Sequence, residues 1–78
     1  MKKYIVKIDD NFIKYTSKFG PFYGNIVTTQ NEKEARLFSR ERDAKTLVST
    51  INYRLRTFEF DKEKFPNVKL VSYKEIIL

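Results

Sequence analysis

A run of apolar residues at helical spacing constrains the fold of this chain more than any other feature of its sequence. The run consists of Ala44, Leu47, Val48, Ile51 and Leu55. Because side chains three or four positions apart share one face of an α-helix, the spacing predicts one main amphipathic helix with a buried stripe. We expect Ser39 to cap this helix, with Glu41 and Asp43 in its first turn, where carboxylates suit the helix dipole. The helix is expected to end near Arg56.

Strand patterns flank this helix on both sides, as alternating apolar and polar side chains or as runs of β-branched residues. The expected strands are residues 3–8, 12–16, 26–29 and 68–77. Asp9, Asp10 and Asn11 separate the first two strands, and because short polar side chains favour turns, they predict a β-hairpin. The order β-β-β-α-β predicts an α+β fold, in which a small antiparallel sheet of three to four strands carries one main amphipathic helix on one face.

The connecting segments are expected to hold little regular structure. Thr29 and Glu32 have the spacing of a capping box, which suggests one or two helical turns over residues 31–35. Short extended pieces are expected at residues 37–38 and 58–60, and a polar turn at residues 61–67.

The length and composition of the chain limit what it can do. Its 78 residues predict a single domain, residues 1–78, with a thin core that needs most of its apolar side chains. The absence of cysteine excludes disulfides and thiolate metal sites, and the absence of histidine removes the commonest general base. No stretch approaches the length of a membrane span, so we expect a cytoplasmic protein without a membrane partner.

The positive charge of the chain points to anionic partners. The net charge is +6, and the excess lies in the first two-thirds of the chain. One flank of the predicted helix carries cations, hydrogen-bonding groups and a tyrosine but no acidic residue: Arg42, Lys45, Ser49, Asn52, Tyr53 and Arg56. Such a row could follow a phosphate backbone, with Lys2, Lys3 and Lys7 extending the basic surface, whereas Asp43 and Arg54 fall on the opposite flank. The alternative is a solvated helix face that keeps a small protein soluble.

A second candidate site is the segment SKFGPFYGN of residues 17–25, which holds both glycines and one proline and is expected to form a loop. Phe19, Phe22 and Tyr23 lie close together in it, and aromatic side chains in a shaped loop are typical anchors of protein interfaces. The alternative is that at least two of these rings close the open end of the thin core, since each aromatic side chain buries about 150–250 Å².

Catalysis and cofactor binding find little support in the sequence. The carboxylate clusters are Asp9 with Asp10, and Glu59, Asp61 and Glu63. Paired carboxylates can act as acid and base or hold a hard cation, but the first pair suits a turn and the second group a charged connection. Gly20 and Gly24 lack the further glycines and the lysine of a nucleotide-binding loop. We therefore expect a protein that is not an enzyme and holds neither a cofactor nor a metal.

The run TQNEKEARLFSRERDA of residues 29–44, preceded by the hairpin KKYIVKIDDNFIKY, resembles a pattern common in small accessory proteins of phages and prophages. In those proteins a strand hairpin leads to T-x5-A-x2-F, then to a helix that opens with an acidic-Ala step, then to a closing strand. The composition, rich in Lys, Ile and Asn, is similar to that of phages of low-GC Gram-positive hosts. The resemblance implies an early-region accessory protein in the bacterial cytoplasm that binds a host or defence protein, CRISPR–Cas components among them. It carries over no site residues, because the pattern encodes a scaffold and no chemistry.

Binding is thus the expected function, and two hypotheses remain open. In the first, the protein docks on a host or defence protein, as an anti-CRISPR inhibitor would, through Phe19, Phe22 and Tyr23 and through a free sheet edge, which could also pair with a second copy. In the second, it is a small basic nucleic-acid-binding module that uses the flank of the main helix. A steep dependence of affinity on salt would favour the second hypothesis, since phosphate neutralisation releases counterions.

Overall fold

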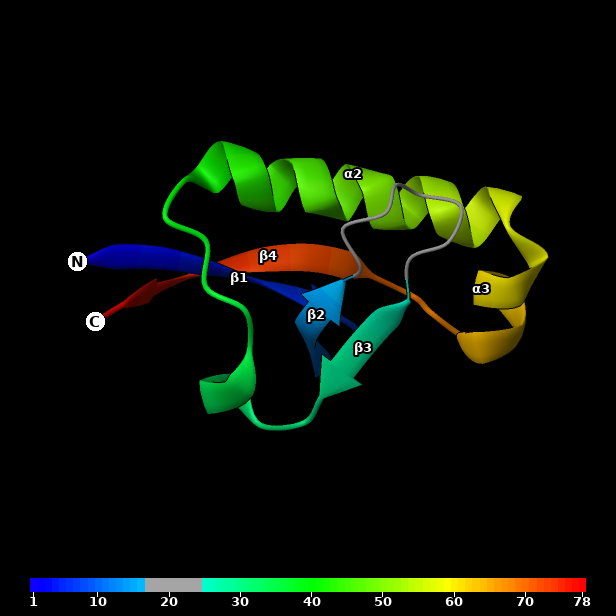
Figure 1. The fold of residues 1–78 in the computed structure, drawn as a ribbon, viewed down its shortest axis with the longest axis horizontal. Helices are drawn as coiled ribbons and strands as arrows, with labels where there is room; N and C mark the ends of the chain where they lie inside the picture. The colour runs from blue at the N-terminus through cyan, green and yellow to red at the C-terminus, as the bar shows by residue number, and fades with distance from the viewer. Residues whose placement is uncertain (17–24) are drawn as a thin grey trace.

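The computed structural model describes residues 1–16 and 25–78, and it shows the predicted α+β fold. Four strands form one antiparallel sheet in the order β3-β2-β1-β4 (Figure 1). The strands are β1 (Lys2–Ile8), β2 (Asn11–Thr16), β3 (Ile26–Thr29) and β4 (Val71–Ile77). The helical elements are the short 3-10 turn η1 (Glu32–Glu34), the main helix α2 (Glu41–Thr57) and the short helix α3 (Glu59–Lys64).

Strand β1 lies inside the sheet and pairs with strands from both ends of the chain. Its pairing with β4 runs the full length of both strands, from Lys2 opposite Ile77 to Ile8 opposite Val71. Its pairing with β2 covers only the two residue pairs next to the hairpin turn, where Asp9 adopts a positive φ of 51°. Aspartate tolerates this left-handed conformation better than most residues, which fits the prediction of a turn at this position.

A short extended segment, residues 36–38, fills the gap where β1 and β2 diverge. Phe38 and Tyr4 exchange two backbone hydrogen bonds, of 2.9 and 2.8 Å. The amide of Arg36 donates to the carbonyl of Ile13 in β2 at 2.9 Å. The extended piece expected at this position is therefore confirmed, and it links the two strands through backbone hydrogen bonds.

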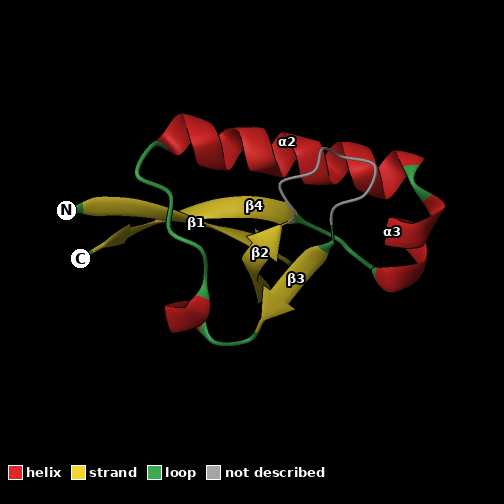
Figure 2. Ribbon diagram, viewed as in Figure 1, coloured by secondary structure: helices red, strands yellow, loops and turns green. Residues whose placement is uncertain are grey.

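Helix α2 packs across one face of the sheet, over β1 and β4 (Figure 2). The fully buried residues of this core include Ala44 and Ile51 of the helix and Val6, Ile13 and Ile26 of the strands. Leu47, Val48 and Leu55 complete the helix side of the contact as partly buried neighbours. The face that the helical spacing identified is therefore the face that packs on the sheet, and burying each large apolar side chain stabilises the fold by about 1.5–3 kcal/mol.

The opposite face of the sheet is partly covered by η1 and its neighbours. Because strand side chains alternate between faces, Ile5 points away from the core that holds Val6 and Ile8, yet Ile5 is fully buried. Its cross-strand neighbour Lys74 shares its face and forms an ion pair with Glu32 of η1. The turn η1 and the helix α2 therefore lie on opposite sides of the sheet, as Figure 1 shows.

Helix α3 occupies most of the extended piece and the first part of the polar turn that the sequence predicts for residues 58–67, whereas residues 65–67 form a bend and a turn. Phe58 both ends α2 and precedes the first residue of α3. The prediction of an extended piece at residues 58–60 is wrong. Phe58 and Phe60 alternate with acidic residues over too few positions to distinguish a strand from a helical turn. An ion pair between Asp61 and Arg54 of α2 holds the segment against α2.

The helix caps also differ from expectation. Arg40, rather than Ser39, is the N-cap of α2, and no side chain bonds the free amides at that end. The Ser39 hydroxyl instead accepts a hydrogen bond from Lys3 Nζ at 2.9 Å, which engages it away from the helix end. The helical turn expected over residues 31–35 is present as η1, but its cap is Asn31 rather than Thr29.

Candidate functional site

The outer flank of α2 is a solvent-accessible surface. All six residues predicted for the basic flank are at least partly exposed: Arg42, Lys45, Ser49, Asn52, Tyr53 and Arg56. The flank is not free of acidic groups, however, because the Glu41 carboxylate lies 3.2 Å from Lys45 Nζ. The hydrogen bond that Lys45 donates to the Glu41 carboxylate, with a further contribution from nearby Tyr73, raises the pKa of Lys45 above its ordinary value. One cation of the predicted row is therefore already paired within the chain.

The C-terminal half of the flank forms one wall of a groove of about 600 Å³. The other walls come from α3 and from the segment that leads into β4. The polar and charged lining consists of Ser49, Asn52, Arg56, Lys62 and Lys69, and the apolar lining includes Leu55, Phe65, Pro66, Val68 and Leu70. The structure thus joins three of the six predicted flank residues to side chains that sequence reasoning did not connect with them.

Three cations line this groove, and each comes from a different segment: Arg56 from α2, Lys62 from α3 and Lys69 from the segment before β4. Lys62 Nζ lies 3.9 Å from a carboxylate oxygen of Glu59, at the outer limit of an ion pair. Arg56 and Lys69 form no ion pair with any described residue. No acidic residue stands among the described residues that line the groove, so its positive charge is largely uncompensated.

The floor of the groove is apolar. Leu55, Phe65 and Val68 are partly buried and pack against the main core, whereas Leu70 is 62% exposed. A recess with an apolar floor and a cationic rim suits a ligand that combines an anionic group with an apolar or planar group.

Asp9 fixes the wall of the groove that carries Lys69 and Leu70. Its carboxylate accepts hydrogen bonds from the amides of Lys69 at 3.0 Å and Leu70 at 2.8 Å, and its own amide donates to the Leu70 carbonyl at 2.8 Å. These bonds occupy the backbone just before β4, which begins at Val71 and not at residue 68 as the sequence predicts. Asp9 therefore shapes a turn and a wall of the groove, which agrees with its expected role in a turn.

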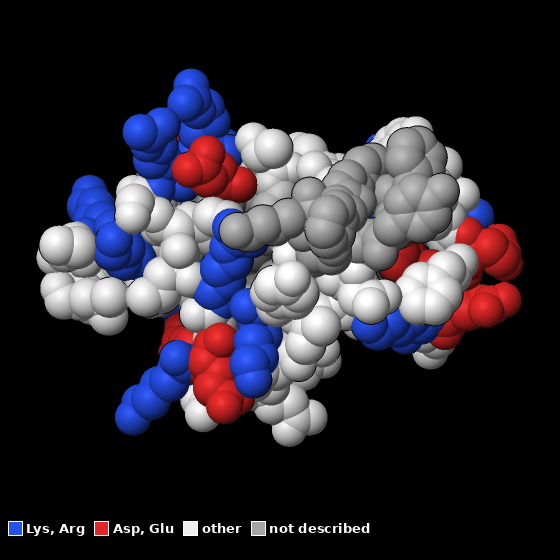
Figure 3. Space-filling model, viewed as in Figure 1, with Lys and Arg blue, Asp and Glu red and all other residues white. Residues whose placement is uncertain are grey.

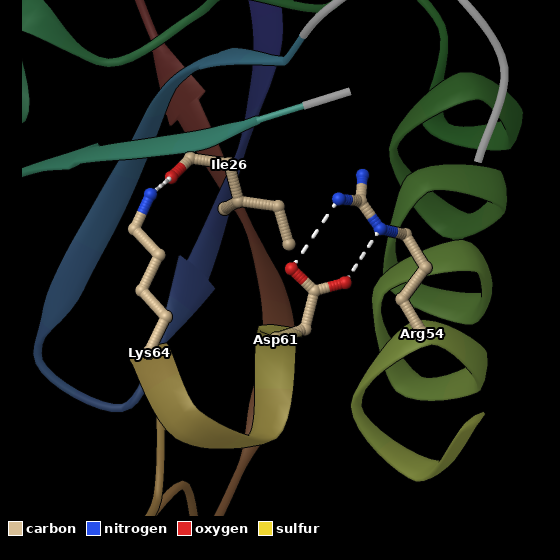
Figure 4. Close-up of polar contacts among 4 residues, drawn as sticks. All are labelled: Ile26, Arg54, Asp61 and Lys64. Atoms are coloured by element: carbon tan, nitrogen blue, oxygen red, sulfur yellow. Dashed lines mark hydrogen bonds and ion pairs between the residues drawn. The ribbon is translucent and has the colours of Figure 1, made fainter. Parts of the chain in front are cut away.

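A buried ion pair holds α3 against the end of α2 (Figure 4). Arg54 Nε lies 2.9 Å from one carboxylate oxygen of Asp61, and Arg54 Nη2 lies 3.4 Å from the other. The two side chains are only 6% and 2% exposed. The sequence-based placement of Asp61 in a solvated charged connection is wrong, because α3 folds back over the flank that carries Arg54. The only signal in the sequence was a basic and an acidic residue on either side of a helix break, which is too common to identify a pair.

A second contact ties α3 to the sheet. Lys64 Nζ donates a hydrogen bond to the carbonyl of Ile26 in β3 at 2.6 Å, as Figure 4 shows. Helix α3 is thus held to α2 on one side and to β3 on the other. These two contacts fix the backbone that carries Lys62 beside the groove.

The lysines of β1 do not extend the flank of α2. The alternation of the strand places Lys3 and Lys7 on the face opposite α2, where Lys7 Nζ lies 5.6 Å from the centroid of the Phe12 ring. Lys2 pairs with Glu75 at 3.6 Å. Figure 3 shows Lys and Arg side chains spread over several elements of the face in view, not gathered in one patch. The groove, and not the total charge, therefore defines the candidate site.

Strand β4 forms one edge of the sheet, since within the described chain it pairs with β1 alone. Apolar side chains gather at the end of this edge: Ile77 is 69% exposed, Leu78 66% and Met1 79%. Backbone hydrogen bonds between Met1 and Leu78 hold the two chain ends together there. An edge strand with an apolar end can pair with a strand of another molecule.

The residues predicted for the aromatic loop, Phe19, Phe22 and Tyr23, lie outside the described residues. Within residues 1–16 and 25–78, no three histidine, cysteine, aspartate or glutamate side chains gather where they could hold a metal ion. In the same part of the chain, no helix combines the length and the apolar character needed to cross a membrane.

Comparisons with known proteins return no relative. The chain matches no family model, no curated protein and no solved structure. The resemblance to phage accessory proteins therefore stays a prediction from the sequence, and the function has to be inferred from the geometry of the groove.

Proposed function

We propose that the protein is a small nucleic-acid-binding module that uses the C-terminal half of α2 and the groove beside it. The observation that carries the proposal is the convergence of Arg56, Lys62 and Lys69 on one groove whose described lining holds no acidic residue. Lysine and arginine neutralise phosphates and release counterions, which is the main source of affinity in sequence-independent binding of nucleic acid. Ser49 and Asn52 add hydrogen-bonding groups to the same wall.

The contacts of the flank support the groove, and not the whole predicted row, as the binding site. Lys45 is paired with Glu41, and Arg42 lies about 21 Å along the helix axis from Arg56. Tyr53 packs edge-on against Phe58, with 6.1 Å between ring centroids, and remains 49% exposed, but it does not line the groove. Arg42 can only contact a ligand that extends along the helix.

The alternative of a solvated face explains less of the structure. Surface charge for solubility requires no recess and no exposed apolar side chain. The groove combines its cations with Leu70, which is 62% exposed although two hydrogen bonds hold its backbone to Asp9. Leu70 therefore offers a ligand in the groove an apolar side chain on backbone that hydrogen bonds hold in place.

The proposal is tested by fluorescence anisotropy with random-sequence duplex DNA and single-stranded RNA at several salt concentrations. We expect micromolar affinity that falls steeply with salt, and the double variant Arg56→Gln/Lys69→Gln should weaken binding and reduce the salt slope by about 1.5–2. The matched control is Lys14→Gln/Lys33→Gln, which removes two exposed lysines that lie outside the groove. An absence of binding, or an equal loss in both double variants, would remove the proposal.

A second candidate function, docking on a host or defence protein, is favoured by the free edge of β4. The charged side chains of this edge strand are engaged within the chain, Lys74 with Glu32 and Glu75 with Lys2, so little free charge opposes an incoming strand. The apolar end of the edge, with Ile77, adds area for contact. This function also agrees with the implied kinship to phage accessory proteins.

The test of this second function is capture of a partner by the immobilised protein, with the variant Ile77→Lys and the control Leu37→Lys. Leu37 is also an exposed apolar residue, at 49% against 69% for Ile77, but lies away from the edge. Capture that is insensitive to salt and lost only in Ile77→Lys would support the edge as the interface. Equal capture by both variants would argue against it, and light scattering of the protein alone would reveal pairing with a second copy.

A further inference from the structure

We infer that the groove accepts an unpaired nucleotide, so that the protein binds single-stranded nucleic acid in preference to a duplex. This inference rests on the proposed function and specifies the ligand of the same site. It follows from the shape of the site, from the chemistry of its floor and from the distribution of its cations.

The three cations are exposed and line a recess. The groove has a volume of about 600 Å³, which lies within the range of about 300–1,000 Å³ typical of sites for small organic ligands. A duplex presents phosphates on a convex surface and keeps its bases stacked inside, so it can touch the rim but cannot fill the floor. An unpaired base can turn into the recess and lie on the floor.

The floor offers a fixed apolar surface for such a base. Leu55 and Val68 pack against the main core from below, and the Phe65 ring is held by Lys64, whose Nζ lies 5.5 Å from the ring centroid. Leu70 stands exposed beside them on backbone that Asp9 anchors. Phe65 is the aromatic side chain of this surface, and stacking of bases on aromatic rings tolerates any sequence because every base has a π-face.

The cations of the groove come from three segments: Arg56 from α2, Lys62 from α3 and Lys69 from the segment before β4. A nucleotide in the groove would therefore meet cations of more than one segment with its phosphates. Ser49 and Asn52 can bond the polar edges of the base, a contact that an acidic peptide does not require.

The experiment compares a 20-nucleotide oligothymidylate with a hairpin duplex of equal phosphate number, by anisotropy at matched salt. We expect the single strand to bind about tenfold more tightly or better. The variant Leu70→Ser should weaken binding of the single strand about fivefold or more, with no change in its salt slope or in the duplex affinity. The control Leu37→Ser removes an exposed leucine away from the groove and should change neither affinity. Thermal unfolding of each variant verifies that the fold is intact.

The outcomes separate this inference from the proposed function. Equal affinity for single strand and duplex, with both sensitive to Arg56→Gln/Lys69→Gln, would overturn the inference and leave nucleic-acid binding in place. Binding to neither probe would remove both. A competition experiment gives a third outcome that would overturn the inference. If polyaspartate of matched charge displaced the single strand as effectively as unlabelled oligothymidylate, the site would recognise charge alone.

Discussion

Arg54 and Arg56 lie two positions apart in α2, yet one belongs to a buried contact and the other to an open groove. Two steps along an α-helix rotate a side chain by about 200°, so the two guanidinium groups point to opposite flanks. Helix α3 folds over one flank, where Asp61 meets Arg54, and leaves the other flank open to solvent. Whether an arginine of this helix is buried or available to a ligand therefore depends on whether α3 packs over it, and not on the residue type.

The two regions should differ in what substitution does to them. A buried ion pair contributes little net stability relative to apolar side chains of the same size, but removal of one partner leaves an uncompensated buried charge. A groove cation is already solvated, so its removal should change ligand affinity and hardly change the free energy of unfolding. Substitutions at the buried contact should consequently cost the most stability, and substitutions of exposed charges the least.

The variant Asp61→Ala should produce the largest loss, about 3–5 kcal/mol in the free energy of unfolding, because it removes the carboxylate that neutralises the buried guanidinium of Arg54. Chemical denaturation measures this loss. The control Glu63→Ala removes an exposed carboxylate from the same helix and should change stability by less than about 0.5 kcal/mol. Similar effects of the two variants would show that the α2–α3 contact does not depend on the ion pair.

The variant Lys64→Met should lower the free energy of unfolding by about 1 kcal/mol, since it removes the hydrogen bond to the Ile26 carbonyl while retaining an unbranched apolar chain. The control Lys62→Met removes a lysine of the same short helix whose closest carboxylate lies 3.9 Å away, and it should leave stability unchanged. If Lys62→Met were the more destabilising variant, the attachment of α3 to β3 through Lys64 would be refuted.

The double variant Arg54→Met/Asp61→Leu should recover most of the stability that Asp61→Ala loses and lie within about 1 kcal/mol of the natural protein. Apolar side chains of similar volume can fill the contact without burying a charge. Denaturation of the double variant and of the single variants Arg54→Met and Asp61→Leu gives the coupling energy of the pair. A double variant as unstable as Asp61→Ala would mean that the charges, and not the filling of space, hold α3 in place.

The smallest effect concerns the exposed pair of Glu41 and Lys45. The variant Glu41→Gln should lower the pKa of Lys45 toward its ordinary value, because the hydrogen bond to the carboxylate is the largest cause of the raised pKa. A raised lysine pKa stabilises the fold below the ordinary pKa, and this stabilisation is lost as the pH rises through the raised value, so any effect on unfolding changes only at alkaline pH. An NMR titration of the Lys45 side chain measures the shift. Asp43→Asn in the same helical turn should leave it unchanged.

Much of the fold follows from local patterns in the sequence. The helical spacing from Ala44 to Leu55 predicted the buried face of α2, and the turn formers after residue 8 predicted the β1–β2 hairpin. Both predictions are confirmed because the spacing of apolar residues and the turn preference of a short segment depend only on residues that are close in the sequence. The accessible positions of Ser49, Asn52 and Arg56 follow from the same periodicity, and these three of the six predicted flank residues line the groove.

The remaining features needed the tertiary structure. The signal for a pair of Asp61 with Arg54, seven positions earlier, is too common to identify the contact, and nothing near Asp9 indicates that it holds the backbone at Lys69 and Leu70. The first contact holds α3 against α2, and the second, between residues 60 positions apart, fixes the segment before β4 that forms another wall of the groove. Helical periodicity is local, so the amino-acid sequence alone specifies which side chains of α2 face water. Which of those side chains share a recess with Lys62 and Lys69 depends on the path of the chain in space, and the fold alone settles it.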